Sequence, residues 1–227
     1  MFLPLKDDNP TNTFSFVTVG LILANCLVFY HQITLNFGAS QRFIFQWAAI
    51  PYQITHGEVL YGKTFVPPIL TLFSSMFLHG GFLHLIGNML YLWIFGNNIE
   101  DAMGHFRFLL FYLLAGLCAA LTQVFSDPQS TTPMIGASGA VAGILGAYLL
   151  LFPRARVLTL MFVFIFIRLI RVPALIVLGF WFLIQLLSVT AGMEGSVAFF
   201  AHIGGFLAGL ILIKAFQPQG KRRRKGY

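Results

Sequence analysis

Charged residues are scarce in this 227-residue chain, since they make up 9% of the sequence and only 7 residues are acidic. An ordinary globular domain carries about 25% charged residues, because its surface faces water. Hydrophobic residues reach 58% here. This composition excludes a soluble enzyme, a coiled coil, a disordered protein and a nucleic-acid-binding module. It predicts instead a multi-pass integral membrane protein that contacts membrane lipids.

Cysteine is also rare, and both copies, Cys26 and Cys118, lie inside apolar stretches. We expect them to pack as small hydrophobic side chains that form no disulfide. The net charge is +7, but 5 of the 14 Lys and Arg residues fall in the run 221–225. A basic run after an apolar helix is typical of a cytoplasmic tail, so it does not indicate a nucleic-acid partner.

Six stretches are apolar enough, at about 20 residues per crossing, to form transmembrane helices. They cover residues 14–36, 82–99, 107–125, 137–152, 172–189 and 197–216. With the N-terminus inside, all basic residues except Arg42 and Lys63 fall on the inner side, which agrees with the positive-inside rule. A seventh crossing through residues 157–170 would place the basic tail outside. We therefore expect 157–170 to be an interfacial segment and predict an all-α polytopic bundle of six transmembrane helices.

The chain is expected to form a single membrane domain, residues 14–216, between a cytoplasmic N-terminal segment, 1–13, and a basic cytoplasmic tail, 217–227. The connection 38–81 is long and rich in aromatic residues, which is typical of an element half embedded in the outer headgroup region. No organellar presequence is recognisable, so a bacterial inner membrane is the expected location. No residue pattern indicates an oligomeric state.

Four polar residues inside the predicted helices stand out, namely His84, Asn88, Ser138 and His202. A polar side chain there costs a few kcal/mol unless it faces a partner or a cavity. At about 1.5 Å per residue, His84, Asn88 and His202 lie about 5, 10 and 7 Å below the outer boundary. The stretch 137–152 reaches only about 24 Å of a core about 30 Å thick, so Ser138 begins about 8 Å below that boundary. Irregular backbone at that depth is tolerated only inside protein or along a water-filled cavity. The four residues therefore predict an active site that opens to the outer side.

Glycines indicate which helices meet at this site. Small-residue stripes let helix backbones approach closely, and two such stripes are present, Gly139, Gly143 and Gly146 on one helix and Gly205 and Gly209 on another. A hydrogen bond from the short side chain of Ser138 to His202 requires such a close crossing. His202 is then the general base that activates Ser138 as a nucleophile.

The remaining polar residues suggest how a developing negative charge is stabilised. His84 and Asn88 stand four residues apart and project from one helix face, so both can donate hydrogen bonds to an oxyanion. The acidic residues on the outer side, Asp127, Glu194 and Glu58, lie in loops. We therefore expect a Ser/His dyad with no acidic third member.

Three motifs resemble those of the rhomboid intramembrane serine proteases. They are Gly136-Ala137-Ser138-Gly139 at a helix start, His79, His84 and Asn88 at spacings of five and four, and Ala201-His202-Ile203-Gly204-Gly205 followed by Gly209. The resemblance implies a serine endopeptidase that cleaves transmembrane protein substrates near their outer ends. It also implies Ser138 as nucleophile, His202 as base, His84 and Asn88 in the oxyanion hole, and structural roles for His79 and Glu100.

The chain departs from the family pattern at two places. The Trp-Arg pair that many rhomboids carry in the first loop is absent, and the aromatic residue that in some members packs on the catalytic histidine is replaced by Ala142. Both departures concern the support of the site and leave its reacting groups in place.

Other functions remain as alternatives. A catalytically inactive rhomboid-like binding factor or chaperone would share the fold, but it would be expected to lack the nucleophile or the base. A small transporter would be expected to show paired ionisable groups or repeated halves. Asparagine is a poor metal ligand and no His-Glu-x-x-His run exists, so no metal ion or other cofactor is expected. Asn25, Gln123 and Gln185 are interpreted as packing residues.

Overall fold

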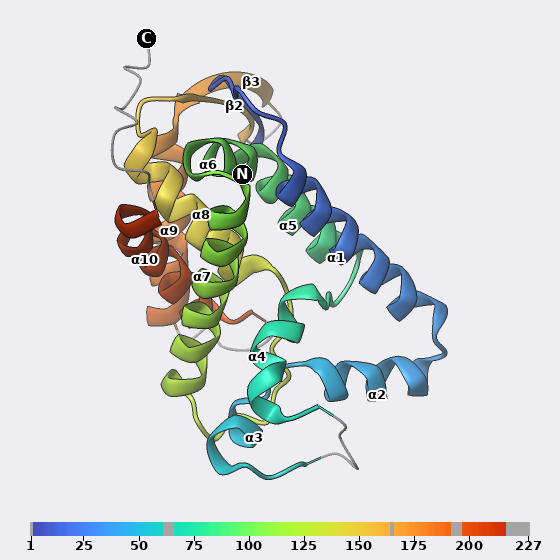
Figure 1. The fold of residues 1–227 in the computed structure, drawn as a ribbon. Coiled ribbons are helices and arrows are strands. Elements are labelled where there is room, and N and C mark those ends of the chain that lie inside the picture. Colours follow the sequence, from blue (N-terminus) through green and yellow to red (C-terminus); the bar gives the residue numbers. More distant parts are fainter. Residues whose placement is uncertain (1, 61–65, 164–165, 192–196, 217–227) are drawn as a thin grey trace.

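The computed structural model describes residues 2–60, 66–163, 166–191 and 197–216 (Figure 1). The fold is mostly helical, and apolar helices occur at all six predicted places. They are α1 (Phe16–Thr34), α5 (Phe82–Tyr91) continued by the π-helical η3 (Leu92–Gly96) and α6 (Asn97–Met103), α7 (His105–Ser126), α8 (Ser138–Leu151), α9 (Ala174–Thr190) and α10 (Phe199–Phe216). The predicted basic tail, 217–227, lies outside the described residues.

The helices differ in length. By length and composition, α1, α7 and α10 can each cross a membrane, and a pair of segments bent by 83°, Pro68–Phe77 with Phe82–Met103, adds a fourth candidate. The apolar helices α8 and α9 are shorter, with 14 and 17 residues. At 1.5 Å per residue α8 spans only about 21 Å, so this helix is short, as the sequence predicted.

Helix α8 lies at the centre of the bundle, with residues 139 to 148 all buried. The glycine stripes bring it against α10: a methyl group added at Gly205 or Gly209 would overlap the carbonyl oxygens of Gly139 and Gly143. On the side facing α7, a methyl group at Gly139 would lie 2.6 Å from the Cβ of Ala119. Any larger side chain in the stripes would therefore push these helices apart.

The long first connection forms several short helices beside the end of the bundle where α8 begins (Figure 1). These are α2 (Phe37–Trp47), α3 (Pro51–His56), η1 (Pro68–Leu70), α4 (Thr71–Ser74) and η2 (Ser75–Phe77). Backbone hydrogen bonds join this connection to the segment that precedes α8, through Ala49 with Met134 and Tyr52 with Ser130. The two loops thus support each other around the start of α8.

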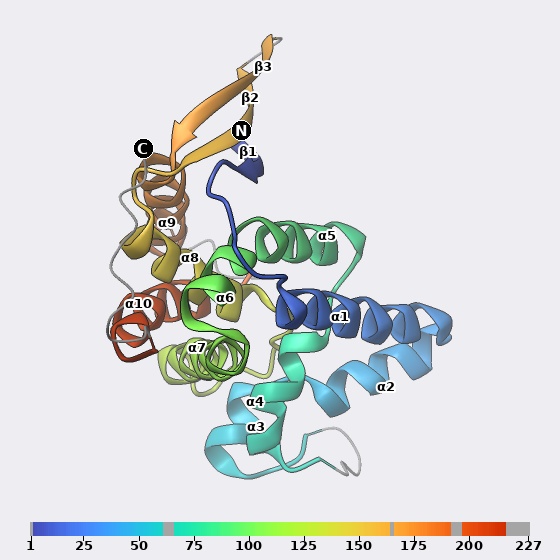
Figure 2. The same ribbon diagram turned by 45° about the horizontal axis from the view of Figure 1, so that its top comes forward.

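The all-α prediction does not extend to the opposite end of the molecule, where three strands form an antiparallel sheet in the order β1-β2-β3. The strands are β1 (Phe2–Asp7), β2 (Arg156–Val163) and β3 (Phe166–Pro173). The segment interpreted as interfacial is thus a hairpin, which projects from the bundle in Figure 2. Its Val, Ile and Phe residues favour strands, and pairing with β1 satisfies backbone groups that a single extended segment would leave open.

Buried polar groups fasten the sheet to the helices. The Asp7 carboxylate, 6% exposed, accepts hydrogen bonds from the Tyr148 hydroxyl of α8 at 2.7 Å and from the Asn98 amide of α6 at 2.8 Å. Glu100 accepts from both the backbone N–H and the hydroxyl of Thr18, at 2.8 and 2.7 Å, and so caps the start of α1. These contacts are compatible with the structural role that the resemblance implied for Glu100.

Candidate active site

Ser138 is the first residue of α8, at the end of this helix that is remote from the sheet. The helix starts here because Gly136 has φ +123°, a conformation that side chains with a Cβ rarely adopt. The Gly136 N–H donates to the Ser75 carbonyl at 2.9 Å, which anchors the turn. Backbone N–H groups in the first turn of a helix lack helical partners, so they are free to face the site.

Ser138 and His202 lie within hydrogen-bonding distance, because the glycine stripes let α8 and α10 cross closely. The Nε2 atom of His202 is 2.8 Å from the Ser138 Oγ. A serine side chain extends only one bond beyond Cβ, so a wider crossing would break this contact. The pair has the geometry in which a histidine can accept the proton of an attacking hydroxyl.

The other side of the His202 ring is held by α9. The Nδ1 atom of His202 is 2.8 Å from the Oε1 of Gln185. From the sequence, we had interpreted Gln185 as a packing residue. The Trp181 ring also lies against His202, with ring centroids 5.8 Å apart. Support for His202 therefore comes from α9, whereas position 142 on α8 carries only alanine. The one sequence signal was the i, i+4 spacing of Trp181 and Gln185, which places both on one helix face.

His84 and Asn88 both face the turn that leads into α8. A methyl group built on Gly136 would lie 2.7 Å from His84 Nε2 and 3.6 Å from Asn88 Nδ2. The His84 Nδ1 is 3.3 Å from the backbone N–H of Gly80, which can only donate. In neutral His84 the proton therefore sits on Nε2, the atom that faces Gly136.

Asn88, like the neighbouring His79 ring, has buried hydrogen-bonding capacity that is not used among the described residues. Its Nδ2 atom is buried and has no hydrogen-bond partner among the described residues. A buried unpaired donor is costly, so it usually has a functional explanation. With His84 Nε2, it gives two donors beside the first turn of α8.

His79 lies behind His84, with ring centroids 5.1 Å apart. Its backbone is fixed by the side chain of Gln32 on α1, which donates to the His79 carbonyl and accepts from the His79 N–H, each at 3.1 Å. This double contact ties the segment before α5 to α1. His79 and Gln32 thus position His84, and neither contacts Ser138.

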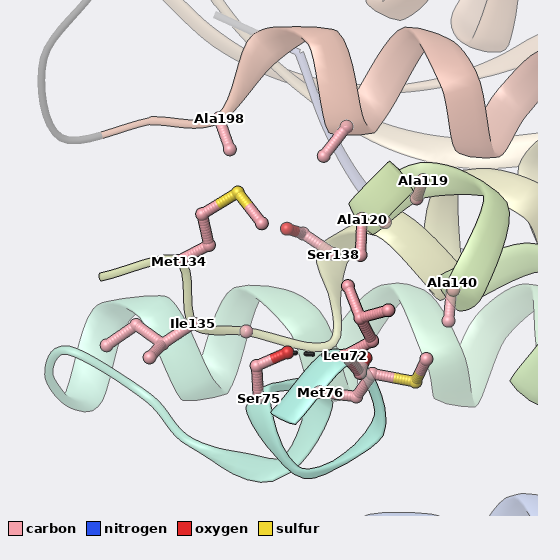
Figure 3. Close-up of a pocket in the computed structure, with 14 residues that line it drawn as sticks. Leu72, Ser75, Met76, Ala119, Ala120, Met134, Ile135, Ser138, Ala140 and Ala198 are labelled. Carbon is pink, nitrogen blue, oxygen red and sulfur yellow. Dashed lines mark hydrogen bonds between the residues drawn. The ribbon is translucent and has the colours of Figure 1, made fainter. Parts of the chain in front are cut away.

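A small cavity of about 40 Å³ opens beside the serine. Ser138 lines it with residues of η2, α7 and the segment 134–136, and in Figure 3 the Ser138 hydroxyl points toward the space bordered by Met134 and Ala198. A cavity needs about 10–15 Å³ to hold one water molecule, so this one has room for water next to the hydroxyl. Within the described residues, no group of three or more His, Cys, Asp or Glu side chains is placed to bind a metal ion.

Comparison with known proteins identifies the family. A family model described as the rhomboid domain matches residues 67–218. The chain is 36% identical to RHOMBOID-like protein 5 of Arabidopsis thaliana over 65% of this chain and 45% of that protein. It is 32% identical to the mitochondrial Rhomboid protein 1 of Saccharomyces cerevisiae over 73% of this chain and 48% of that protein.

This chain is also similar to a bacterial protein. The Rhomboid protease GluP of Bacillus subtilis is 33% identical over 63% of this chain and 25% of its own length. The chain thus matches less than half of the length of each of these three relatives. The match to the rhomboid domain covers more than half of this chain and includes all four candidate site residues, so the chain belongs to the rhomboid family of membrane proteins.

Proposed function

We propose that this protein is an intramembrane serine endopeptidase that hydrolyses peptide bonds in or near transmembrane segments of other membrane proteins. The observation that carries the proposal is the 2.8 Å contact between Ser138 Oγ and His202 Nε2 at the start of a short buried helix. Membership of a family that includes a protein named as a protease supports it.

In the first half of the reaction, Ser138 Oγ attacks the carbonyl carbon of the scissile peptide bond while its proton passes to His202 Nε2. The tetrahedral intermediate then collapses as the C–N bond breaks. The leaving amine takes the proton from Nε2, and the carbonyl fragment remains attached to Ser138 as an ester. His202 thus acts first as a base and then as an acid.

The tetrahedral intermediate carries a negative oxygen, which the site can stabilise with fixed donors. We assign this role to His84 Nε2–H, Asn88 Nδ2–H and the backbone N–H of Ser138. Donors that are already oriented stabilise developing charge without reorganisation, and each contributes most in surroundings that exclude bulk water.

Water completes the cycle. A water molecule in the cavity beside Ser138 loses a proton to His202 Nε2 as its oxygen attacks the ester carbon. The ester bond then breaks, and Ser138 Oγ recovers the proton from His202. Ser138 and Ser75 both line this cavity and can supply hydrogen bonds to such a water.

The distribution of basic residues supports one orientation of the protein in the membrane. Basic residues gather on the three strands at the sheet end, as Lys6, Arg156, Arg168 and Arg171, whereas Arg42 lies on α2 at the other end. By the positive-inside rule, this distribution supports an orientation with the sheet and the N-terminus in the cytoplasm and the Ser138 site open to the outer side. Labelling of single cysteines with a membrane-impermeant reagent tests this orientation.

Cleavage of a reporter with one transmembrane segment, in liposomes, tests the proposed activity. The wild type is expected to produce two fragments, while Ser138→Ala at the same protein level produces none. A folded wild type that binds the reporter and never cuts it would contradict the proposal. That result would support the alternative, an inactive rhomboid-like binding factor.

A further inference from the structure

Apart from Ser138, one polar side chain among the described residues is hydrogen-bonded to His202. Gln185 is buried on α9, with 7% exposure, and its Oε1 is 2.8 Å from His202 Nδ1. A glutamine inside an apolar helix is commonly satisfied by the backbone of its own preceding turn. Gln185 does this with one end only, since its Nε2 donates to the Trp181 carbonyl at 3.2 Å.

The two contacts of Gln185 fix the direction of its amide. The Trp181 carbonyl can only accept, so the NH₂ end of the amide must face Trp181. The oxygen end then faces His202, and because this oxygen can only accept, Nδ1 of His202 must carry a proton. In a neutral imidazole the other nitrogen, Nε2, is then unprotonated. This is the tautomer that can accept the proton of Ser138.

We propose that Gln185 is a positioning residue that holds His202 in this tautomer and ring orientation, and so completes a neutral Ser138–His202–Gln185 relay. The proposal rests on the proposed function, because the relay matters only if His202 is a base. In the better-known triad this position is filled by a carboxylate. Here an amide oxygen makes the corresponding contact without a charge.

The location explains why a neutral acceptor suits this position. A buried carboxylate with no basic partner would cost several kcal/mol at this depth. Among the described residues, no Lys or Arg belongs to the elements that contribute His202, Gln185 and Ser138 to the relay, except Lys214 at the far end of α10. An amide supplies the acceptor and avoids this cost.

The relay also joins three helices. Its nucleophile lies on α8, its base on α10 and its positioning residue on α9. The Trp181 ring packs against His202 from the same face of α9. A correctly seated α9 is therefore needed for a correctly oriented base, whereas the contact between α8 and α10 alone leaves one side of the imidazole unsupported.

Three variants test the relay. Gln185→Met keeps the length of the side chain and removes the acceptor, whereas Gln185→Glu keeps an acceptor oxygen. The matched control is Ser188→Ala, which changes another buried polar residue of α9. Each protein is tested for thermal unfolding, for kcat and KM with the transmembrane reporter, and for the labelling rate with a fluorophosphonate. This small probe reacts with an activated serine, so its rate does not depend on how a large substrate enters.

Gln185→Met is expected to lower kcat and the labelling rate about 10- to 100-fold, the usual cost of removing a partner that orients a functional histidine. KM is expected to stay unchanged, because the partner acts on the base and not on substrate binding. The folded fraction of Gln185→Glu is expected to recover most of the lost labelling, although the buried carboxylate lowers its unfolding temperature. Ser188→Ala is expected to match the wild type. Nitrogen-15 spectra of the wild type are expected to show His202 protonated at Nδ1 and unprotonated at Nε2.

Labelling of Gln185→Met at the wild-type rate, or a wild-type His202 protonated at Nε2, would overturn the relay. Gln185→Glu no faster than Gln185→Met would do the same. The tautomer of His202 is measured on the wild type, so this measurement tests the relay even if Gln185→Met does not fold. A wild type that is itself neither labelled nor active would instead contradict the proposed function.

Discussion

The two ends of α8 carry buried polar groups that are paired in different ways. At the sheet end, Tyr148 donates to Asp7, and the same carboxylate receives the Asn98 amide. At the other end, Ser138 contacts His202, while the Asn88 Nδ2 beside the first turn has no partner among the described residues. The first arrangement uses its hydrogen bonds to hold strands and helices together. The second leaves the Asn88 donor without a partner among the described residues, which its proposed oxyanion role requires.

Loss of a buried polar residue should have different effects at the two ends of α8. Loss of a polar group at the sheet end should lower stability and leave the chemistry of the folded protein intact. Loss of one at the Ser138 end should lower the reaction rate and leave the fold intact. Four predictions, taken in order of expected effect, test this division.

The largest effect is expected from the dyad. Ser138→Ala removes the nucleophile and His202→Ala removes its base, so either change should abolish measurable cleavage of the reporter with little change in thermal unfolding. Groups that act as one unit lose nearly all activity with the first deletion. The double variant should therefore be no slower than either single variant, and a double variant clearly slower than both would show that the two residues act separately.

Asn88→Ala should have a smaller effect, because it removes one oxyanion donor among several. The expected loss is about 10² to 10³ in rate, with residual cleavage still measurable. Removing an unpaired buried donor should not destabilise the protein. An Asn88→Ala protein with wild-type kcat and a lowered unfolding temperature would place Asn88 with the structural groups instead.

Asn98→Ala is the matched change at the sheet end, since Asn98 lies on the continuation of the same helix. It takes a hydrogen-bond donor from the buried Asp7 carboxylate, which should cost about 1–3 kcal/mol of stability. The folded fraction should react with the fluorophosphonate at the wild-type rate. Comparing the two asparagine variants in one labelling assay tests the division between the ends directly.

The smallest effect concerns pH. Burial raises the pKa of the Asp7 carboxyl above the ordinary value of an aspartate. The stability that Asp7 contributes is thus fully present below the unfolded-state pKa and is lost as the pH rises through the higher folded-state pKa. Asp7→Asn retains an oxygen acceptor, so it should remove this part of the pH dependence of thermal unfolding. If Asp7→Asn and the wild type showed the same pH dependence of thermal unfolding, Asp7 would not titrate between its unfolded-state and folded-state pKa values.

The sequence predicted the parts of the fold that depend on a single helix and its neighbours. Apolar runs gave the positions of the helices, and the length of residues 137–152 indicated a short helix. The stripes at Gly139 and Gly205 predicted the close crossing that the structure contains. Apolar residues and glycines recur along each of these helices, so each pattern can be recognised within one stretch of the sequence.

The sheet and the Gln185 contact depend on segments that are far apart in the chain, and the sequence did not predict them. Residues 157–170 are mostly apolar, so hydrophobicity hides their strand character. Their pairing with β1 joins residues about 150 positions apart. A glutamine inside an apolar helix is compatible with a packing role alone, and the sequence does not show that the Gln185 amide reaches His202. The close approach of α9 to α10 brings the two side chains together.

The most direct test of the account is to identify the residue that a fluorophosphonate modifies, by mass spectrometry of the labelled protein. We expect a single modification, on Ser138, in the wild type. Asn88→Ala should be modified at a lower rate, and folded Asn98→Ala at the wild-type rate. Ser138→Ala and His202→Ala should not be modified. Labelling of His202→Ala at the wild-type rate would contradict the central claim, because the serine would then be activated by a group other than this histidine.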